Sequence, residues 1–319
     1  MALPDFLVVG APKAGTTALH AALAAHPELL MSRVKEPRYF LCDDGVPPPR
    51  RGGPGDAQTY QEYIWRRQDY EALFAGRGEW MLAGESSPFY LWDRAAHRRI
   101  RAAIPDAKLI AVLRDPVERA YSNWAHLWSA GLEPCGDFLE ACGREAERVA
   151  AGWAPFWRYL ELGRYGEQLR DLLRAFPREQ LLILRYRELR DEPAAALARV
   201  CEFLGVTPGL VTAVPRENVR PQIRNGPATL VLQEVLRAGA GVGQYFPLPV
   251  RRLARGPVLA ALQRRSRPRE PLTRDQRAEL IGRLAPDVRR LERVTGLYFG
   301  DWLQAEGAVE GALLRHVPA

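Results

Sequence analysis

The chain has 319 residues, of which 47% are hydrophobic and 26% are charged, with a formal net charge of +7. This length and composition suffice for a sizeable core and exclude a wholly disordered chain, a collagen and a coiled coil. The sequence has no run of about 18 apolar residues, so we expect no membrane-spanning helix. The first residues lack the pattern of a signal peptide, so we expect a cytoplasmic protein.

The cysteines and the lysines limit which kinds of functional site the sequence predicts. The four cysteines form no CxxC pair and have no histidine at metal-ligand spacing, which predicts reduced, mostly buried thiols. Only three of the 45 Lys+Arg residues are lysines, and Lys13 and Lys35 stand beside glycine-rich or acidic motifs. The net charge could suit a nucleic acid, an anionic surface or an anionic small cofactor. The arginines are scattered among acidic residues, which favours a mixed solvated surface, and we expect no nucleic-acid partner; a non-catalytic module that binds nucleotide or nucleic acid is an alternative.

The chain opens with a strand, a turn and a helix. Residues 5–10 form a short apolar run that ends in glycine, as in a buried parallel strand. A turn over 11–17 follows, and residues 18–26 predict a helix that ends before Pro27. This order is half of a βαβ unit.

Strands and helices continue to alternate after this unit. Further strands are predicted at 81–86, 108–116 and 181–186, and helices at 60–74, 93–104, 117–129, 136–150, 165–176, 193–206 and 273–294. The pattern predicts a three-layer α/β fold of the P-loop type, with a central parallel sheet flanked by helices and an α-helical insertion or cap.

We expect one domain over residues 1–319. Residues 42–58 are rich in proline and glycine and predict a flexible loop. Residues 207–272 are partly irregular and are expected to cover the substrate or cofactor, and residues 304–319 to form a tail.

The strongest local signal is GAPKAGTT, residues 10–17, between the first strand and the first helix. Successive backbone N–H groups in such a loop can cradle an anion, and the helix N-terminus favours negative charge. Gly10 and Gly15 have Walker A spacing, but Thr16 stands where nucleotide-hydrolysing enzymes have lysine, and the lysine has moved to Lys13. A P-loop kinase or NTPase is therefore the weaker alternative.

The second signal is LRDPVERAYSNWAH, residues 113–126. Arg114 ends a strand at the sheet edge where α/β folds bind ligands, and Ser122 lies two helical turns further on. An arginine and a hydroxyl on adjoining elements suit a phosphate monoester, although a structural ion pair of Arg114 is the alternative. Asp115, between Arg114 and Pro116, is predicted to be a salt-bridged turn residue and not a magnesium ligand.

Together these segments resemble those of the sulfotransferases that use 3′-phosphoadenosine-5′-phosphosulfate (PAPS). Residues 12–17 resemble the family's 5′-phosphosulfate loop PKxGTT, and residues 114–122 its 3′-phosphate motif RxPxxRxxS. KEPRYF (35–40) and GESSPFY (84–90) are similar to the KExxFF and GExSPxY segments of the glycan-acting branch. Further similarity over 163–206 and 291–302 extends the resemblance along most of the chain.

The resemblance implies an O-sulfotransferase that moves the sulfuryl group of PAPS to an acceptor hydroxyl and releases 3′-phosphoadenosine-5′-phosphate (PAP), with no metal required. The cofactor-binding residues it implies are Pro12, Lys13, Ala14, Gly15, Thr16, Thr17, Arg114, Ser122 and Tyr186, with Arg224 in place of a missing glycine-rich loop. Two departures distinguish this chain. Ala18 and Leu19 follow the threonines where the cytosolic branch has tryptophan first, and Ser86 stands where glycan-type enzymes often have lysine.

Lys13 and Glu36 are the predicted catalytic residues. Lys13, with Thr16 and the loop amides, would stabilise charge on the leaving phosphate. The resemblance places the general base at Glu36, whose alternative is an exposed carboxylate paired with Lys35 or Arg38. The rivals for the base are four of the five histidines, His20, His26, His97 and His126.

The acceptor is predicted to be a small molecule or carbohydrate, such as a natural product or a glycolipid. The resemblance and the aromatic content around it make Lys35, Arg38, Phe40, Phe89 and Tyr90 the predicted acceptor-binding residues, with Trp92 a further candidate. The pairs Trp124/Trp128 and Trp153/Trp157 have helical spacing, which more often reflects core packing. A homodimer is allowed by the sequence.

Overall fold

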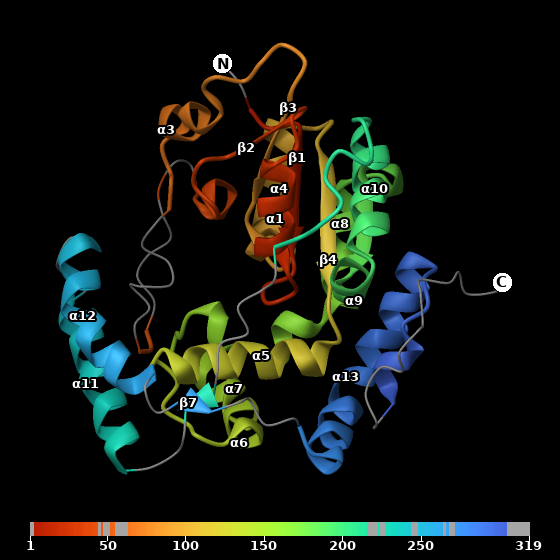
Figure 1. Ribbon diagram of the computed structural model, residues 1–319. Helices are drawn as coiled ribbons and strands as arrows, with labels where there is room; N and C mark the ends of the chain where they lie inside the picture. Colours follow the sequence, from red (N-terminus) through yellow and green to blue (C-terminus); the bar gives the residue numbers. More distant parts are fainter. Residues whose placement is uncertain are drawn as a thin grey trace.

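The computed structural model of the chain describes residues 3–43, 46, 52–54, 63–215, 222–223, 227–243, 248–263, 266–267 and 272–304. Its centre is a five-stranded parallel sheet in the order β2-β3-β1-β4-β5 (Figure 1). The strands are β1 (Phe6–Gly10), β2 (Leu29–Met31), β3 (Leu82–Ser86), β4 (Lys108–Leu113) and β5 (Leu181–Arg185). Every residue of β1 is buried, as its unbroken apolar run predicts.

The sequence predicted four of these five strands and missed β2. This strand has only three residues, paired with β3 from Leu29↔Leu82 to Met31↔Gly84. Three residues are too few to show a periodic pattern. The missed strand matters, because the chain that follows it leads directly into the Glu36 segment beside β3.

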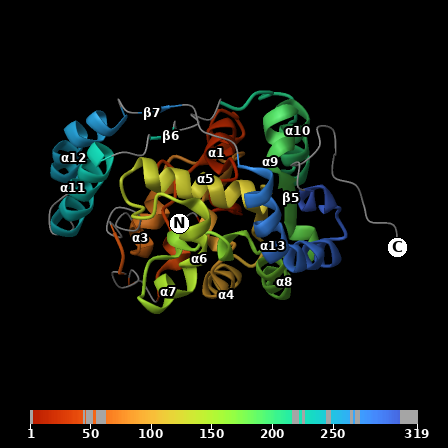
Figure 2. The same ribbon diagram turned by 90° about the horizontal axis from the view of Figure 1, so that it is seen from below.

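Helices cover both faces of the sheet, which confirms the predicted three-layer α/β fold. α1 (Thr16–Ala24) and α10 (Pro193–Leu204) lie on one face, and α4 (Arg94–Ala103) and α8 (Tyr165–Ala175) on the other (Figure 2). α13 (Arg274–Thr295) packs against α8. The two-sided arrangement follows from right-handed crossovers that leave β1 and β3 in opposite directions across the sheet.

Local signals in the sequence fix where several helices begin and end. α4 begins after Asp93, whose carboxylate accepts hydrogen bonds from the backbone N–H groups of Ala95 and Ala96. α10 ends at Gly205, which adopts φ 83°. The predicted helices at 93–104 and 193–206 therefore match the structure within two residues.

A layer of helices lies across the carboxyl ends of the strands and forms the predicted α-helical cap (Figure 1). It consists of α5 (Pro116–Ser129), α6 (Phe138–Gly143) and α7 (Glu145–Ala150). The cap has its own hydrophobic cluster, in which Trp124, Trp128 and Trp157 are buried, as the core interpretation of their spacing predicts. The single helix predicted over 136–150 is wrong, because the chain leaves helical geometry at Arg144 and forms two short helices.

The remaining elements are short or peripheral. They are α3 (Arg67–Glu71), α9 (Tyr186–Asp191), the pair α11 (Pro227–Gly243) and α12 (Leu248–Gln263), the two-residue strands β6 (Gln222–Ile223) and β7 (Ser266–Arg267), and the 3₁₀ turns η1 (Tyr39–Leu41), η2 (Ala72–Phe74), η3 (Pro88–Tyr90), η4 (Pro155–Trp157), η5 (Glu161–Gly163), η6 (Arg178–Gln180) and η7 (Gly300–Leu303). The helix predicted at 60–74 is too long, since Arg66 is extended and α3 begins only at Arg67. Most of the predicted 42–58 loop and of the 304–319 tail lies outside the described residues.

The last features of the fold are the four cysteines, the hydropathy of the helices and the edge strand β5. All four cysteines are buried and free of disulfides, as predicted. Among the helices that the structure describes, none is both long and apolar enough to cross a membrane. At the edge strand β5, Arg178 donates to the carbonyl of Leu181 (2.5 Å) and Arg199 to that of Ile183 (3.4 Å).

Candidate active site

The phosphate loop runs from the carboxyl end of β1 into the first turn of α1. Lys13 and Gly15 adopt φ 68° and 87°, so the loop turns through two left-handed residues. A Cβ on Gly15 would lie 2.8 Å from the ring of Tyr186, so glycine is required by conformation and by space. No side chain caps the N-terminus of α1, and its first turn has no acidic residue, which leaves a positive helix end for an anion.

Arg114 and Tyr186 meet this loop from two other elements. The Arg114 guanidinium lies 4.7 Å from the centroid of the Tyr186 ring, and its Nη1 donates to the backbone carbonyl of Lys13 (3.4 Å). Arg114 ends β4 beside β1, and Tyr186 begins α9 directly after β5. Arg114 is only loosely paired with Glu118 (3.6 Å), so a structural ion pair does not account fully for it. The structure thus brings together three predicted cofactor residues from distant parts of the chain.

The Lys13 side chain faces the helical cap. Its Nζ lies 3.5 Å from Nδ1 of His126 on α5. The His126 ring packs edge-on against Phe156, which packs in turn against Phe89 (ring centroids 5.7 and 5.8 Å apart). Phe89 was predicted to contact the acceptor, whereas Phe156 was missed. Its proximity to Trp153 and Trp157 in the sequence was the available signal.

The other predicted cofactor residues occupy different environments. Thr17 is exposed and Ser122 is half-buried, whereas the remaining loop residues are buried: Pro12, Ala14, Gly15 and Thr16. Arg119, the second arginine of the 3′-phosphate motif, is fully buried and bonds to Asn123 (3.0 Å) and to the carbonyl of Tyr159. Arg119 therefore fastens α5 within the cap. Arg224 lies outside the described residues, and contacts of all these residues with a cofactor stay predictions.

Glu36 lies between two cations. Its Oε1 is 2.5 Å from Lys35 Nζ and its Oε2 is 2.8 Å from Arg38 Nη2. Burial opposes its ionisation, but the charges and hydrogen bonds of Lys35 and Arg38 outweigh burial and hold the pKa of Glu36 at about 2. The predicted alternative, pairing with Lys35 or Arg38, is confirmed for both partners. The Glu36 side chain is 23% exposed.

The backbone around Glu36 has an unusual conformation. Glu36 and Arg38 adopt φ 60° and 59°, a region that non-glycine residues rarely occupy. The Glu36 N–H donates to the carbonyl of Ser86 at the end of β3 (3.0 Å). The segment 35–40, hereafter the Glu36 loop, therefore lies along the carboxyl end of β3, beside the phosphate-loop strand β1.

The four histidines that are rivals for the base separate into two groups. His26 and His97 are buried and bond to the backbone carbonyls of Thr207 (2.9 Å) and Leu91 (3.1 Å), which gives them structural roles. His20 Nδ1 lies 3.0 Å from the Ser86 hydroxyl. Burial, and next the charge of Lys35, lower the pKa of His20 to about 4, so its ring is neutral at pH 7. His20 and His126 are the two rivals to Glu36 that lie near predicted site residues.

Phe40 and Tyr90, both predicted acceptor residues, are buried in the sheet core. Phe40 packs edge-on against the rings of Tyr70 and Tyr90, each at 5.6 Å. This packing alone accounts for their burial, and their contact with an acceptor stays a prediction. Among the predicted acceptor residues, Lys35 and Arg38 pair with Glu36, and Phe89 packs against Phe156 beside His126. These three residues therefore lie closest to the charged groups of the site.

Asp115 is the salt-bridged turn residue that the sequence predicted. Its Oδ1 accepts from the N–H groups of Val117 (2.9 Å) and Glu118 (3.2 Å), and its Oδ2 pairs with the buried Arg277 (2.5 Å). The carboxylate thus caps α5 and joins it to α13. In the part of the chain that the structure describes, no group of three or more His, Cys, Asp or Glu residues is placed to hold a metal.

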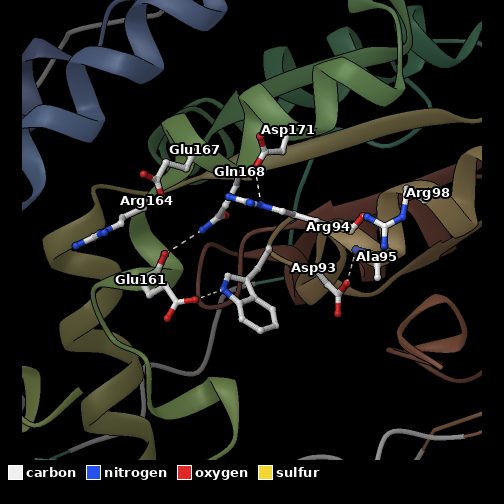
Figure 3. A pocket seen from close by; sticks show the side chains of 10 residues that line it. Asp93, Arg94, Ala95, Arg98, Glu161, Arg164, Glu167, Gln168 and Asp171 are labelled. Atoms are coloured by element: carbon white, nitrogen blue, oxygen red, sulfur yellow. Dashed lines mark hydrogen bonds and ion pairs between the residues drawn. The ribbon is translucent and has the colours of Figure 1, made fainter. Parts of the chain in front are cut away.

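A cavity of about 420 Å³ lies elsewhere, between the start of α4 and the η5–α8 segment (Figure 3). Its polar residues pair with each other: Trp92 Nε1 donates to Glu161 (2.8 Å), and Arg94 pairs with Asp171 (2.6 Å). Trp92, the further acceptor candidate, is one of the ten residues that line this cavity, and the other nine are not among the predicted catalytic, cofactor-binding or acceptor-binding residues. The cavity therefore adds nothing to the site at the sheet edge.

Comparison with known protein families places this geometry. The model of the sulfotransferase family matches residues 31–208, which include the Glu36 loop, Arg114 and Tyr186. The chain belongs to the sulfotransferase family.

Individual relatives agree with this assignment. Carbohydrate sulfotransferase 15 of Mus musculus is 29% identical over 286 residues, covering 74% of this chain and 51% of that protein. Heparan sulfate glucosamine 3-O-sulfotransferase 3A1 of Mus musculus is 31% identical over 205 residues, covering 64% and 46%. The chain thus spans about half the length of the curated relatives it matches. The crystal structure of a sulfotransferase from Alicyclobacillus acidocaldarius is similar at a TM-score of 0.72 and 29% identity, covering 95% of this chain and all of that one.

Proposed function

We propose that the chain transfers the sulfuryl group of PAPS to a hydroxyl of a sugar-containing or other small-molecule acceptor. One observation supports this most: Lys13, Arg114 and Tyr186 converge at the phosphate loop. The Glu36 loop lies at the carboxyl end of β3, the neighbour of β1 in the sheet. A polyanion site and a carboxylate at one sheet edge suit in-line group transfer.

The residues present fit the donor PAPS, whose chemistry is to supply an activated sulfuryl group. The loop amides, the N-terminus of α1 and Lys13 would hold the 5′-phosphosulfate, since they offer N–H groups and positive charge. Arg114 and Ser122 would hold the 3′-phosphate. Tyr186, packed between Gly15 and Arg114, would contact the adenine, as the family resemblance implies.

The chemical roles of Lys13 and Glu36 follow from their charges. Glu36 takes the proton of the acceptor hydroxyl as the acceptor oxygen bonds to sulfur. The bond between sulfur and the bridging oxygen breaks, and PAP leaves with that electron pair. Lys13 stabilises the charge that develops on this oxygen.

The paired state of Glu36 links base strength to acceptor binding. A carboxylate whose pKa is about 2 is a weak base while Lys35 and Arg38 both hold it. An acceptor hydroxyl that replaces one of these cation contacts raises the pKa of Glu36 toward its usual range. The base then becomes effective only when the acceptor is in place.

The relatives guide the proposed acceptor class. Two of them are named for carbohydrate and for heparan sulfate glucosamine. We therefore favour a sugar hydroxyl, on a natural product or a glycolipid. Whether the enzyme acts as a homodimer stays a prediction to test by its mass in solution.

Phosphoryl transfer by a P-loop kinase or NTPase is the alternative. It would need an acidic side chain at a strand end to share a magnesium ion. Asp115, the candidate at the end of β4, is engaged with Arg277 and with two backbone N–H groups. This observation favours sulfuryl transfer.

The first test is calorimetry with PAP in the absence of magnesium, with ATP and 5′-AMP as controls. We expect micromolar binding that requires the 3′-phosphate and is weakened by about 10- to 100-fold in Arg114→Ala. A preference for ATP with magnesium would contradict the proposal. Transfer of ³⁵S from PAPS to a panel of oligosaccharides then identifies the acceptor class.

A further inference from the structure

Glu85 is a buried carboxylate that the proposed chemistry does not use. It is the fourth residue of β3 and is fully buried. Its Oε1 accepts hydrogen bonds from the hydroxyls of Tyr90 (2.7 Å) and Tyr70 (3.2 Å), and its Oε2 from that of Ser87 (2.8 Å). Within the described chain no lysine or arginine pairs with it. Burial of such a group is costly, so its presence requires a reason beyond packing.

Two of the three hydroxyls extend from Glu85 to the Glu36 loop. The Ser87 oxygen accepts the backbone N–H of Arg38 (3.1 Å), and the Tyr90 oxygen accepts that of Phe40 (3.3 Å). Among the residues that the structure describes, the third hydroxyl, on Tyr70, bonds to Glu85 alone, while the Tyr70 ring stacks on Tyr39 with centroids 4.2 Å apart. Two hydroxyls therefore act as bridges, and one does not.

The direction of these hydrogen bonds depends on the carboxylate. A hydroxyl has one proton, so a hydroxyl that donates to Glu85 turns its lone pairs toward other donors. The amides of Arg38 and Phe40 are such donors. The left-handed conformations of Glu36 and Arg38 cost free energy and persist only where the surroundings fix them.

We propose that Glu85 is a positioning residue, which orients the backbone of the Glu36 loop through Ser87 and Tyr90 and so holds Glu36 at the site. The inference rests on the proposed function only in treating Glu36 as the base. The hydrogen bonds themselves are independent of the reaction.

The ionisation of Glu85 adds a pH-dependent consequence. Burial raises the pKa of Glu85 to about 7, against the hydrogen bonds from Tyr90, Ser87 and Tyr70, and the charge of Glu36 adds to the rise. Above pH 7 the carboxylate accepts all three hydroxyls. Below pH 7 the Glu85 carboxyl group carries a proton that it donates in turn. One of the three hydroxyls must then rotate to accept this proton. Burial places the pKa values of Tyr70 and Tyr90 well above 10, so neither titrates in this range.

The first experiment measures amide hydrogen exchange at Arg38 and Phe40 in the full chain at pH 8. Ser87→Ala should speed exchange at Arg38, and Tyr90→Phe at Phe40, by about two- to tenfold, the loss expected for one hydrogen bond. Tyr70→Phe is the matched control, because it removes a hydroxyl from the same carboxylate without a bond to the loop. Unchanged exchange in Ser87→Ala and Tyr90→Phe, or an equal change in Tyr70→Phe, would overturn the proposal.

The second experiment measures sulfuryl transfer. Glu85→Gln and Tyr90→Phe should lower kcat and leave the affinity for PAP unchanged, and Glu85→Gln should remove an inflection near pH 7 from the kcat profile. An equal loss of kcat in Tyr70→Phe would reduce Glu85 to a packing role. If the wild-type chain transfers no sulfuryl group, the proposed function fails, and the exchange experiment still decides the role of Glu85. If Glu85→Gln does not fold, Tyr90→Phe and Ser87→Ala decide it.

Discussion

The two sides of the site, the phosphate side (residues 10–17, Arg114 and Tyr186) and the acceptor side (the Glu36 loop), are held in different ways. On the phosphate side, the strand order places β1, β4 and β5 in adjacent positions, and the residues at their carboxyl ends meet as a result. On the acceptor side, a strained loop is bonded to β3 by side chains, among them Ser87 and Tyr90. The difference teaches that topology brings the proposed donor site together, whereas individual hydroxyls hold the loop of the proposed base.

Glu36→Gln should have the largest effect on turnover. Loss of the general base lowers kcat by about 10²–10⁴-fold and leaves PAP affinity unchanged. Because the pKa of Glu36 is about 2, the residue stays ionised above about pH 4, and its titration gives no acid limb near neutral pH. Glu167→Gln is the control in steady-state kinetics. Glu167 lies on α8 and pairs with Arg290 of α13 (2.9 Å). Retained turnover would transfer the base role to His20 or His126.

Lys13→Ala tests the phosphate side. We expect kcat to fall by about 10²–10³-fold, since one contact to the developing charge is lost. Lys108→Ala is the matched control, because Lys108 lies at the amino end of β4 and donates to the carbonyl of Leu204 (2.9 Å). Single-turnover rates measure both. A change of only a few fold in Lys13→Ala would show that the loop amides suffice.

Arg114→Ala should act on affinity more than on rate. Loss of a charged hydrogen-bonding partner weakens PAP binding by about 10- to 100-fold. The affinity for 5′-AMP, which lacks the 3′-phosphate, should change little. Calorimetry with both ligands makes the comparison, and equal losses would instead assign Arg114 to the structure of the loop.

Asp115→Asn should have the smallest effect on the reaction and a clear effect on stability. The amide still caps α5, but the buried Arg277 loses its charged partner, at a cost of about 3–5 kcal/mol. Urea unfolding measures this loss. Glu118→Gln, which alters a loose and exposed pair, should stay within about 0.5 kcal/mol. If the free energy of PAP binding in Asp115→Asn fell by as much as the free energy of unfolding, Asp115 would belong to the phosphate side.

The sequence predicted that the phosphate loop and Arg114 would lie at one edge of the sheet, and the structure brings them together. Gly10, Lys13 and Arg114 each follow a short buried strand, and parallel strands bring such positions to one edge. The pairing of Glu36 with its neighbours and the burial of Trp124 and Trp128 were also foreseen. These features depend on local pattern or on neighbours in the chain.

The parts that the sequence did not predict depend on contacts between distant residues. β2 is too short for a pattern, and Phe156 meets His126 only through the folding of the cap. Glu85 lies in a segment that the resemblance marked, yet nothing in the segment shows that three hydroxyls would surround it. The strained conformation of Glu36 likewise follows from these contacts and not from its residue type.

The arginines at the edge of β5 have a consequence for how copies of this chain meet. An open strand edge presents unpaired carbonyls on which a strand of another molecule can form. Here the carbonyls of Leu181 and Ile183 already accept hydrogen bonds from Arg178 and Arg199. An incoming strand would have to displace two guanidinium groups and bring its own backbone against their charge. The sheet is thereby protected at this edge from extension into an aggregate.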